Sequence, residues 1–551
     1  MDNQRLILLL VFSFSLIMLW DAWLKQGQPK PVVQQPVPTV STAQAPPSGA
    51  VPVPVAGSAA PVVPGTTAAT VSSAAKITVK TDLFEADISA LGGDLIRLEL
   101  IKHRATGDAS HNFVLFEGKH AYAAQSGLAG GNLPNHRSNW ILPAAGLDLK
   151  DGQDVLRVRL ESATADGVKV AKTYVFKRGN YEIGVEHEIQ NNGAAALSPS
   201  AYFQLVRNGQ APEGTSSGMM SGVSTFTGPA FYTEAGKYHK VDFSDIAKDK
   251  AKAPDKADNG WIAMVQHYFV AAWIPEGKDQ REFYVRKLGD DLFAAGVILP
   301  MASIAPGASG KLVTNLYAGP QVQDKLSKIA PGLNLVVDYG WLTVIAAPLF
   351  WVLEAIHGVV GNWGWAIIGL TVLLKLIFFP LSAASYKSMA KMKLLTPKLT
   401  KLKETYGDDK QRMNQEMMEL YKREKVNPLG GCLPILVQIP VFIALYWVLL
   451  GTVEMRQAPW LGWVGDLSVK DPYFILPLVM GATMLLQTSL NPAPPDPIQA
   501  KIMWIMPIVF TGMFLFFPAG LVLYWTVNNL LSIAQQWQVN RMIERAGIKS
   551  H

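Results

Sequence analysis

The sequence has a single cysteine, Cys432, among its 551 residues. A chain with one cysteine cannot form an internal disulfide, so a domain outside the cytoplasm must be held together by its hydrophobic core alone. No cysteine follows the first apolar segment, which excludes attachment of a lipid at that place. Charged residues are also scarce, at 17% against 49% apolar residues, and this balance is typical of a protein that lies partly in lipid.

Motifs for catalysis are missing as well. The histidines before residue 320 show no spacing typical of metal ligands, and the chain contains no nucleotide-binding or nucleophile motif. We therefore expect no catalytic residue, no metal, no cofactor and no specific nucleic-acid partner.

The chain begins with an apolar run, residues 6–20, that lacks the small residues of a signal-peptidase site at its end. We interpret residues 1–25 as an uncleaved signal-anchor span whose N-terminus lies in the cytoplasm, and a cleaved signal peptide is the alternative. Residues 26–75 are rich in Pro, Ala, Val, Thr and Ser and carry almost no charge. This composition is typical of an extended tether.

From residue 76 to residue 320 the sequence alternates between apolar and polar residues with period two. The clearest runs are 84–88, 155–160, 168–176, 181–189 and 311–317, and turn residues such as Arg178-Gly179-Asn180 separate them. Many short strands without intervening helices predict a large antiparallel β-sandwich with a structural or partner-binding role.

Residues 321–357 predict a linker followed by an amphipathic helix. The apolar stretch 337–356 contains Pro348 and has acidic residues near both ends. We therefore expect a helix that lies in the outer membrane interface rather than a span.

Residues 358–540 predict a core of five membrane spans, at about 363–380, 433–450, 473–490, 502–517 and 521–537. With the signal anchor there are six spans, and the distribution of Lys and Arg places both termini and the basic tail 541–551 in the cytoplasm. The fold class expected is thus a polytopic α-helical membrane protein with a large periplasmic antiparallel β-sandwich domain.

The first two of these five spans are joined by a strongly basic segment, 382–427. Its apolar residues recur at helical spacing in two stripes, on either side of Gly407-Asp408-Asp409, which predicts two short helices in an antiparallel hairpin. We expect the hairpin to lie in the cytoplasm. The cations expected to contact the ribosome or the lipid surface are Lys387, Lys391, Lys398, Lys401, Lys403, Lys422 and Arg423.

Lys375 lies inside the first of the five spans, ten residues after Trp365. That distance is ~15 Å of helix, or roughly half of a hydrocarbon layer about 30 Å thick. A lysine at this depth costs on the order of 2.5–3.5 kcal/mol, and the five spans contain no Asp, Glu or His to pair with it. We therefore expect a hydrated groove in which Thr371, Gln438 and Asn528 lie near Lys375. The alternative is that Lys375 snorkels to the inner surface.

A groove of this kind must be closed on the outer side, since an open aqueous path would leak ions. We expect the plug to consist of Trp363, Trp365 and the turn Phe516-Phe517-Pro518. The absence of acids and histidines argues against a proton-coupled transporter, although a channel or solute transporter stays the alternative function. A periplasmic carbohydrate-binding or carbohydrate-modifying protein on a membrane anchor is a third class.

Several motifs resemble those of the YidC family of bacterial membrane protein insertases, in its Gram-negative form, and the likeness is dense over residues 338–545. They are Asn427-Pro-Leu-Gly-Gly-Cys-Leu-Pro434, Gly407-Asp-Asp-Lys-Gln-Arg412, Arg456-Gln-Ala-Pro-Trp460, Asp471-Pro-Tyr-Phe-Ile-Leu-Pro477 and Phe517-Pro-Ala-Gly-Leu-Val-Leu-Tyr524.

The resemblance implies a groove that is open to cytoplasm and lipid, closed on the outer side, and positively charged to attract the incoming segment. The groove residue of the family is commonly arginine, and here it is Lys375; where relatives carry two tyrosines, this chain has Tyr524-Trp525. The resemblance also implies that the sandwich is similar to sugar-mutarotase folds without their catalysis.

The function that this likeness implies is that of an insertase and chaperone of the bacterial inner membrane, which inserts integral membrane proteins and helps them fold, alone or with the Sec translocon. The partners implied are nascent membrane proteins, the ribosome, the Sec translocon with its accessory subunits, and membrane lipids.

Overall fold

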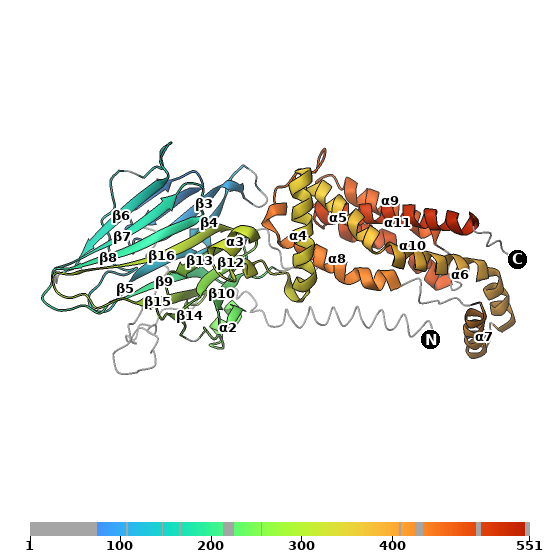
Figure 1. Ribbon diagram of the computed structural model, residues 1–551, viewed down its shortest axis with the longest axis horizontal. Coiled ribbons are helices and arrows are strands. Elements are labelled where there is room, and N and C mark those ends of the chain that lie inside the picture. Colours follow the sequence, from blue (N-terminus) through green and yellow to red (C-terminus); the bar gives the residue numbers. More distant parts are fainter. Residues whose placement is uncertain are drawn as a thin grey trace, which may run out of the picture. The chain divides into compact units, whose positions relative to one another are not determined.

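The computed structural model describes residues 74–545, except 106–107, 109, 146, 165–166, 213–224, 255, 407–408, 425–432 and 492–496. The expected signal anchor, the tether and Cys432 lie outside these described residues. The first part of the described chain, up to Pro320, consists mainly of strands, and the part from Gln323 onward is helical (Figure 1).

The strands form two eight-stranded sheets in which every pair is antiparallel, which confirms the predicted antiparallel sandwich. One sheet has the order β1-β2-β3-β5-β9-β15-β14, with β4 paired to β3, and the other has the order β11-β10-β12-β13-β16-β8-β7-β6. The strands are β1 Lys76–Lys80, β2 Phe84–Ser89, β3 Leu95–Arg104, β4 Asn112–Phe116, β5 Ala123–Ala129, β6 Val155–Ala163, β7 Val168–Lys177, β8 Glu182–Asn191, β9 Ser200–Asn208, β10 Gly228–Thr233, β11 Lys237–Lys240, β12 Trp261–Gln266, β13 Phe269–Pro275, β14 Glu282–Gly289, β15 Leu292–Pro300 and β16 Ser309–Pro320.

The period-two alternation of β7 shows how the sandwich forms. Val168 and Val170 are buried in the core between the sheets, whereas Lys169 between them is exposed. The turn that joins β7 to β8 contains Gly179 at φ +70°, a left-handed conformation that glycine adopts without steric cost. Apolar residues on one face and a permissive turn residue at the strand end together fix the register of this hairpin.

Among the described residues, eight longer helices, α4 to α11, follow the short α2 and α3. The helices are α2 Phe243–Ala247, α3 Gln323–Ile329, α4 Thr343–Val360, α5 Trp363–Ile377, α6 Phe379–Tyr406, α7 Lys410–Arg423, α8 Leu433–Gly451, α9 Ile475–Leu490, α10 Pro497–Phe514 and α11 Ala519–Arg545. Within this part α11 packs against α5, α6, α8 and α9.

Helix α4 runs through Pro348 without a break. One face, which includes Leu349 and Leu353, is buried, while Val344 and Trp351 on other faces are exposed. Among the described residues it is the one helix that is long and apolar enough to cross a membrane by itself, with a mean hydropathy of 1.7. Its placement in the outer interface therefore stays a prediction.

The chain bends by 62° between α5 and the start of α6. Pro380 lies at this bend. Proline lacks a backbone N–H and disfavours a helical conformation of the residue before it, which explains why the helix is interrupted here. The expectation that the hairpin would consist of two short helices is wrong for its first arm. Helix α6 extends over 28 residues from Phe379 and contains Pro397 in its interior, so the first arm is a continuous extension of the bend.

The two arms of the hairpin do pack through their apolar stripes, as the spacing predicts. Leu395 and Leu399 of α6 and Tyr421 of α7 form a small buried cluster, against which Met392, Met417 and Leu420 pack. Lys398 of α6 also pairs with Glu424 at 2.6 Å.

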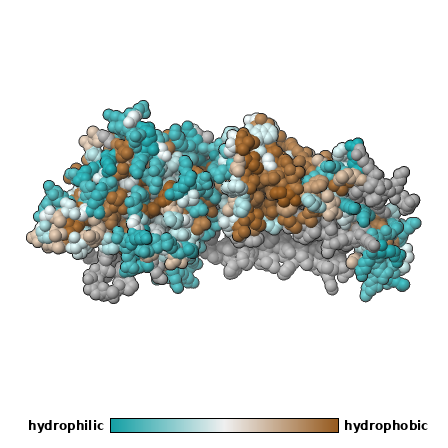
Figure 2. Space-filling view, in the orientation of Figure 1, coloured by the Kyte–Doolittle hydropathy of each residue, from teal (hydrophilic) through white to brown (hydrophobic). Residues whose placement is uncertain are grey.

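The surfaces of the two parts differ in character. Figure 2 shows hydrophobic side chains gathered over the helical part, while the sandwich and the α6–α7 hairpin are mainly hydrophilic. The exposed apolar residues of the helical part include Leu376 on α5, Leu478 on α9, and Ile505 and Ile508 on α10. Apolar faces of this extent are typical of helices that contact lipid.

Candidate functional site

A pocket of about 370 Å³ lies among α5, α6, α8, α9 and α11. Its lining is mainly polar on α6 and α11 and mixed on α8 and α9. The lining residues are Lys375, Ser382, Ser385, Tyr386, Gln438, Ile439, Phe442, Met484, Gln487, Thr488, Asn491, Tyr524, Trp525, Asn528, Asn529 and Ser532. The structure thus places five of the six residues expected in the groove around one cavity: Lys375, Gln438, Asn528, Tyr524 and Trp525.

The helical repeat of α11 explains how its residues reach this pocket. Tyr524, Asn528 and Ser532 follow one another at intervals of four residues, so they lie on one face of the helix. On α6, Ser382 and Ser385 are three residues apart and share a face for the same reason. Both serines are buried.

Lys375 lies in the last turn of α5 and is only 6% exposed. Its ammonium group donates a hydrogen bond to Ser532 Oγ at 2.6 Å, and Ser532 Oγ in turn donates to the backbone carbonyl of Asn528 at 2.7 Å. The hydroxyl of Tyr386 donates to the Ser532 carbonyl at 3.4 Å. The carbonyls at the C-terminal end of α5 also favour a cation at this position.

Among the described residues that line the pocket there is no Asp, Glu or His, so this part of the lining supplies no counter-charge for Lys375. Its polar groups are hydroxyls, amides and one indole. The side chain therefore lies among neutral groups instead of extending along its stem toward a charged surface, and this arrangement favours the groove over snorkelling.

Thr371 does not line the pocket, contrary to the prediction. Its side chain is 1% exposed, and its hydroxyl donates to the backbone carbonyl of Ile367 at 2.7 Å. A threonine in a helix commonly satisfies its hydroxyl in this way, one turn back along its own helix. Sequence spacing placed Thr371 on the same face as Lys375 but could not show that the hydroxyl was already bonded.

An aromatic wall closes one side of the pocket. Phe442 of α8 lies edge-on to Trp525, with ring centroids 4.5 Å apart, and stacks near Tyr524 at 6.1 Å. The ring centroids of Phe514 and Trp525 are 5.5 Å apart. The indole Nε1 of Trp525 is buried and has no hydrogen-bond partner among the described residues.

Sequence reasoning missed Ser382, Ser385, Tyr386 and Ser532. The first three were assigned to a cytoplasmic hairpin, because the chain was expected to leave the membrane at Pro380. A signal existed for Ser532, which lies four residues after Asn528 and therefore on the same face of a helix. Gln487 and Asn529, which lie within the predicted spans, also line the pocket.

The residues expected to plug the outer end lie away from the pocket lining. Phe517 stacks on Phe514 at 5.0 Å and contacts Tyr446 at 5.8 Å. Trp365 lies edge-on to Trp460 at 5.9 Å and is 48% exposed. Closure of the outer end by these residues stays a prediction.

The hairpin cations are mostly accessible. Exposed side chains are those of Lys387, Lys398, Lys401, Lys422 and Arg423, and Lys391 is half-buried. The side chain of Lys403 lies outside the described part of the chain. Their contact with a ribosome or a lipid surface stays a prediction.

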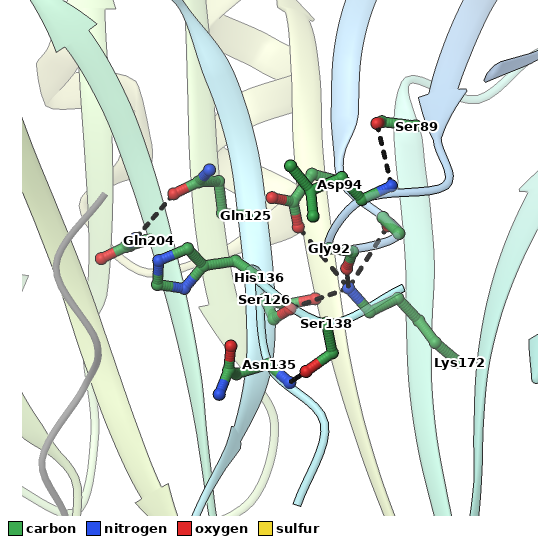
Figure 3. Close-up of polar contacts among 12 residues, drawn as sticks. Ser89, Gly92, Asp94, Gln125, Ser126, Asn135, His136, Ser138, Lys172 and Gln204 are labelled. Atoms are coloured by element: carbon green, nitrogen blue, oxygen red, sulfur yellow. Dashed lines mark hydrogen bonds and ion pairs between the residues drawn. The ribbon is translucent and has the colours of Figure 1, made fainter. Parts of the chain in front are cut away.

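A second polar cluster lies inside the sandwich (Figure 3). Lys172 of β7, which is 0% exposed, donates to the carbonyls of Gly92 at 2.8 Å and Ser126 at 2.7 Å, and lies 3.7 Å from Asp94 Oδ1. Burial raises the pKa of Asp94 to about 7, against the attraction of Lys172. Burial lowers the pKa of Lys172 to about 8, against the attraction of Asp94.

This cluster joins parts of the sandwich that are distant in sequence. Gln204 of β9 donates to Gln125 of β5 at 2.7 Å, and His136 contacts the hydroxyl of Tyr202. All these side chains are buried, and in the part of the chain that the structure describes no group of three His, Cys, Asp or Glu side chains is placed to hold a metal ion. The cluster is therefore best explained as a structural element.

Comparison with known proteins covers the whole chain. Residues 76–352 match the family described as the YidC periplasmic domain, and residues 355–546 match the family described as the 60Kd inner membrane protein. The chain is 62% identical to the membrane protein insertase YidC of Aromatoleum aromaticum, over 99% of this chain and 98% of that protein. It is 59% identical to the protein of the same name from Dechloromonas aromatica, with the same coverage of both chains.

Two solved structures show weaker likeness. A crystal structure of an active YidC insertase gives a TM-score of 0.39 at 17% identity, over 83% of this chain and 91% of that one. A galactose mutarotase-like protein from Lactobacillus casei gives a TM-score of 0.29 at 10% identity, over 44% of this chain and 100% of that one.

Proposed function

The chain belongs to the family of the membrane protein insertase YidC, and on that premise we propose how its pocket and its hairpin contribute to insertion. Its function is the insertion of membrane proteins rather than an enzymatic reaction. It is a multi-pass protein of the inner membrane with a periplasmic domain. The predicted family, fold class, function and location are thereby confirmed.

In this proposal the pocket receives the polar flank of an incoming hydrophobic segment. Lys375 stabilises acidic residues in that flank, while Gln438 and Asn528 supply hydrogen bonds that would otherwise come from water. The observation that carries the proposal is a buried cation, bonded to one serine, in a cavity without an acidic residue in its described lining. Such a cation lacks a partner of opposite charge until a ligand supplies one.

The energetic role of the pocket follows from the cost of carrying charge through lipid. An acidic residue at the centre of a bilayer costs on the order of 2.5–3.5 kcal/mol on insertion scales. A polar, hydrated path shortens the apolar distance that the flank must cross, and Lys375 offsets part of the remaining cost. The membrane potential would add ~2.3 kcal/mol per charge per 100 mV. No nucleotide is needed for these driving forces.

The apolar part of the segment would pass into lipid along the aromatic wall. Phe442, Tyr524 and Trp525 line the pocket beside Ile439 and Met484, so the cavity has an apolar side as well as a polar one. A segment with an apolar stretch and an acidic flank matches both sides. The same wall would shield a partly folded client, which is the chaperone part of the function.

The α6–α7 hairpin would receive the segment at the ribosome. Its exposed cations suit contact with ribosomal RNA or anionic lipid, because both carry phosphate groups. Cooperation with the Sec translocon and its accessory subunits belongs to the same proposal, since the family resemblance implies it.

Site-specific crosslinking tests this function. A photo-reactive amino acid at position 375 should crosslink to a stalled nascent membrane protein with an acidic flank. The matched control is position 370 on the same helix, because Leu370 is 1% exposed and does not line the pocket. Equal crosslinking from both positions, or none from position 375, would contradict the proposed path.

A further inference from the structure

The ammonium group of Lys375 has unused hydrogen-bonding capacity. It carries three N–H donors, and within the described residues one of them is given to Ser532 Oγ. Ser532 uses its own proton on the Asn528 carbonyl, so toward Lys375 it acts as an acceptor. Two donors of a buried cation are therefore left for a group that enters the pocket.

The surroundings of this ammonium are rich in further donors. Trp525 lines the same pocket, and its buried indole N–H has no partner among the described residues. The hydroxyl of Ser382 belongs to the same lining, whereas the hydroxyl of Tyr386 already donates to the Ser532 carbonyl. A cation beside hydroxyls and an indole N–H, without an acid in the described lining, is complementary to an anion.

Part of the lining that α8 and α9 contribute is apolar. Ile439 and Phe442 of α8 and Met484 of α9 form it, and Ile439 is 44% exposed at the surface of the helical part. A ligand that satisfies the whole pocket therefore has an anionic group joined to an apolar chain.

We propose that the pocket binds a phosphate group, and that the phosphate is the headgroup of a phospholipid which occupies the site while no client is bound. Phospholipids are the anionic groups with attached apolar chains that surround these helices in a membrane. Lysine binds phosphate as a point charge and does not require the planar fork of arginine. The acidic flank of a client then displaces the lipid phosphate, so that Lys375 exchanges one anion for another.

This inference shares its pocket with the proposed insertion path but concerns the state without a client. Native mass spectrometry of the full-length protein in detergent tests it, after mixing with phosphatidylglycerol. A galactosyl diacylglycerol of the same chain length, which lacks phosphate, measures binding through the chains alone. A third mixture contains inorganic phosphate without lipid and measures binding of the free anion.

We expect phosphatidylglycerol to stay bound, and Lys375→Gln to weaken its binding by about tenfold or more, the typical effect of losing a charged hydrogen bond. Lys375→Arg should retain the lipid, which shows that the pocket survives substitution. Lys501→Gln is the matched control, because it removes an exposed lysine of α10 outside the pocket. It should leave lipid binding unchanged.

Retention of phosphatidylglycerol by Lys375→Gln at the parent level would overturn the proposal, as would equal retention of the galactolipid. If inorganic phosphate binds with the same dependence on Lys375 and the phospholipid does not, the source is free phosphate and the lipid assignment is wrong. The assay contains no client. Loss of client crosslinking from position 375 with normal lipid binding would therefore count against the insertion path alone.

Discussion

Two lysine side chains are buried among the described residues, Lys172 in the sandwich and Lys375 in the helical part. Lys172 has a carboxylate, that of Asp94, and backbone carbonyls around it. Lys375 has one serine hydroxyl and no acid among the described residues of its pocket. A buried charge must be compensated in either case. In the sandwich, protein groups compensate the charge of Lys172, so its role is structural. In the pocket, the charge of Lys375 is left for a ligand to compensate, so Lys375 is available for function.

The largest effect is expected from a substitution of Lys172, which should destabilise the sandwich. Lys172→Met removes the donor to three backbone carbonyls and leaves Asp94 buried without its counter-charge. Breaking a buried pair from one side costs about 3–5 kcal/mol. Hydrogen exchange of the sandwich amides in the full-length protein should show this loss in the free energy of opening. Lys169→Met, an exposed position on the same strand, should change it little, and equal effects of both would refute the structural role.

The second effect is a pH dependence of sandwich stability that comes from Asp94. Its pKa is raised to about 7 in the folded state from 3.8, so between pH 4 and 7 the folded state binds more protons than the unfolded state. Stability from this group is therefore present at low pH and lost as pH rises through 7, by on the order of 2–4 kcal/mol. The measurement is the difference in opening free energy between the parent and Asp94→Asn at several pH values. If the difference in opening free energy between the parent and Asp94→Asn stays constant with pH, the pKa of Asp94 is not raised in the folded state.

The third prediction reverses the charge in the pocket. Lys375→Glu should slow the insertion of clients with acidic translocated tails by roughly tenfold, or ~1.4 kcal/mol, because repulsion replaces attraction. Lys375→Arg should keep insertion, since the charge is retained. Insertion can be followed by protease protection of the client in membrane vesicles. Normal insertion of acidic-tailed clients by the Glu variant would rule out an electrostatic role.

A smaller effect concerns access of water to the pocket. In a Cys432→Ser background, single cysteines at positions 438 and 528 should react with a small polar maleimide added from the cytoplasmic side. A cysteine at position 371 should react several-fold more slowly, because Thr371 is buried outside the lining. Buried apolar positions such as 370 and 449 serve as slow references. Inert cysteines at both 438 and 528 would favour the snorkelling interpretation.

The smallest effect is expected from removing most of the sandwich. Deletion of residues 90–300 takes away Lys172 and Asp94 but leaves every residue of the pocket lining, so client insertion should stay close to normal. The assay is growth after depletion of the parent protein, with a blot to confirm that the shortened protein is present. Complete loss of growth with a stable, membrane-located variant would show that the sandwich contributes to insertion directly.

The sequence by itself determined the class of both parts. Period-two alternation predicted the antiparallel strands, because a strand with one buried face places alternate side chains in the core. Apolar helical segments without any acid predicted that Lys375 would need a polar cavity. The sequence also contained a signal for Lys172 that went unused, since period two places it on the face of Val168 and Val170. Burial of a lysine on a core-facing position implies a partner.

The tertiary structure alone decided which groups meet these lysines. Asp94, in the turn before β3, and Lys172 of β7 are distant in sequence, and no local pattern pairs them. The bend at Pro380 brought Ser382 and Ser385 of α6 to the pocket, whereas the sequence assigned them to the cytoplasm. Thr371 was excluded because its hydroxyl is bonded to its own helix. Spacing fixes the face of a helix on which a side chain lies, but the direction of a bend and the partner of a hydroxyl depend on the packing of neighbouring helices.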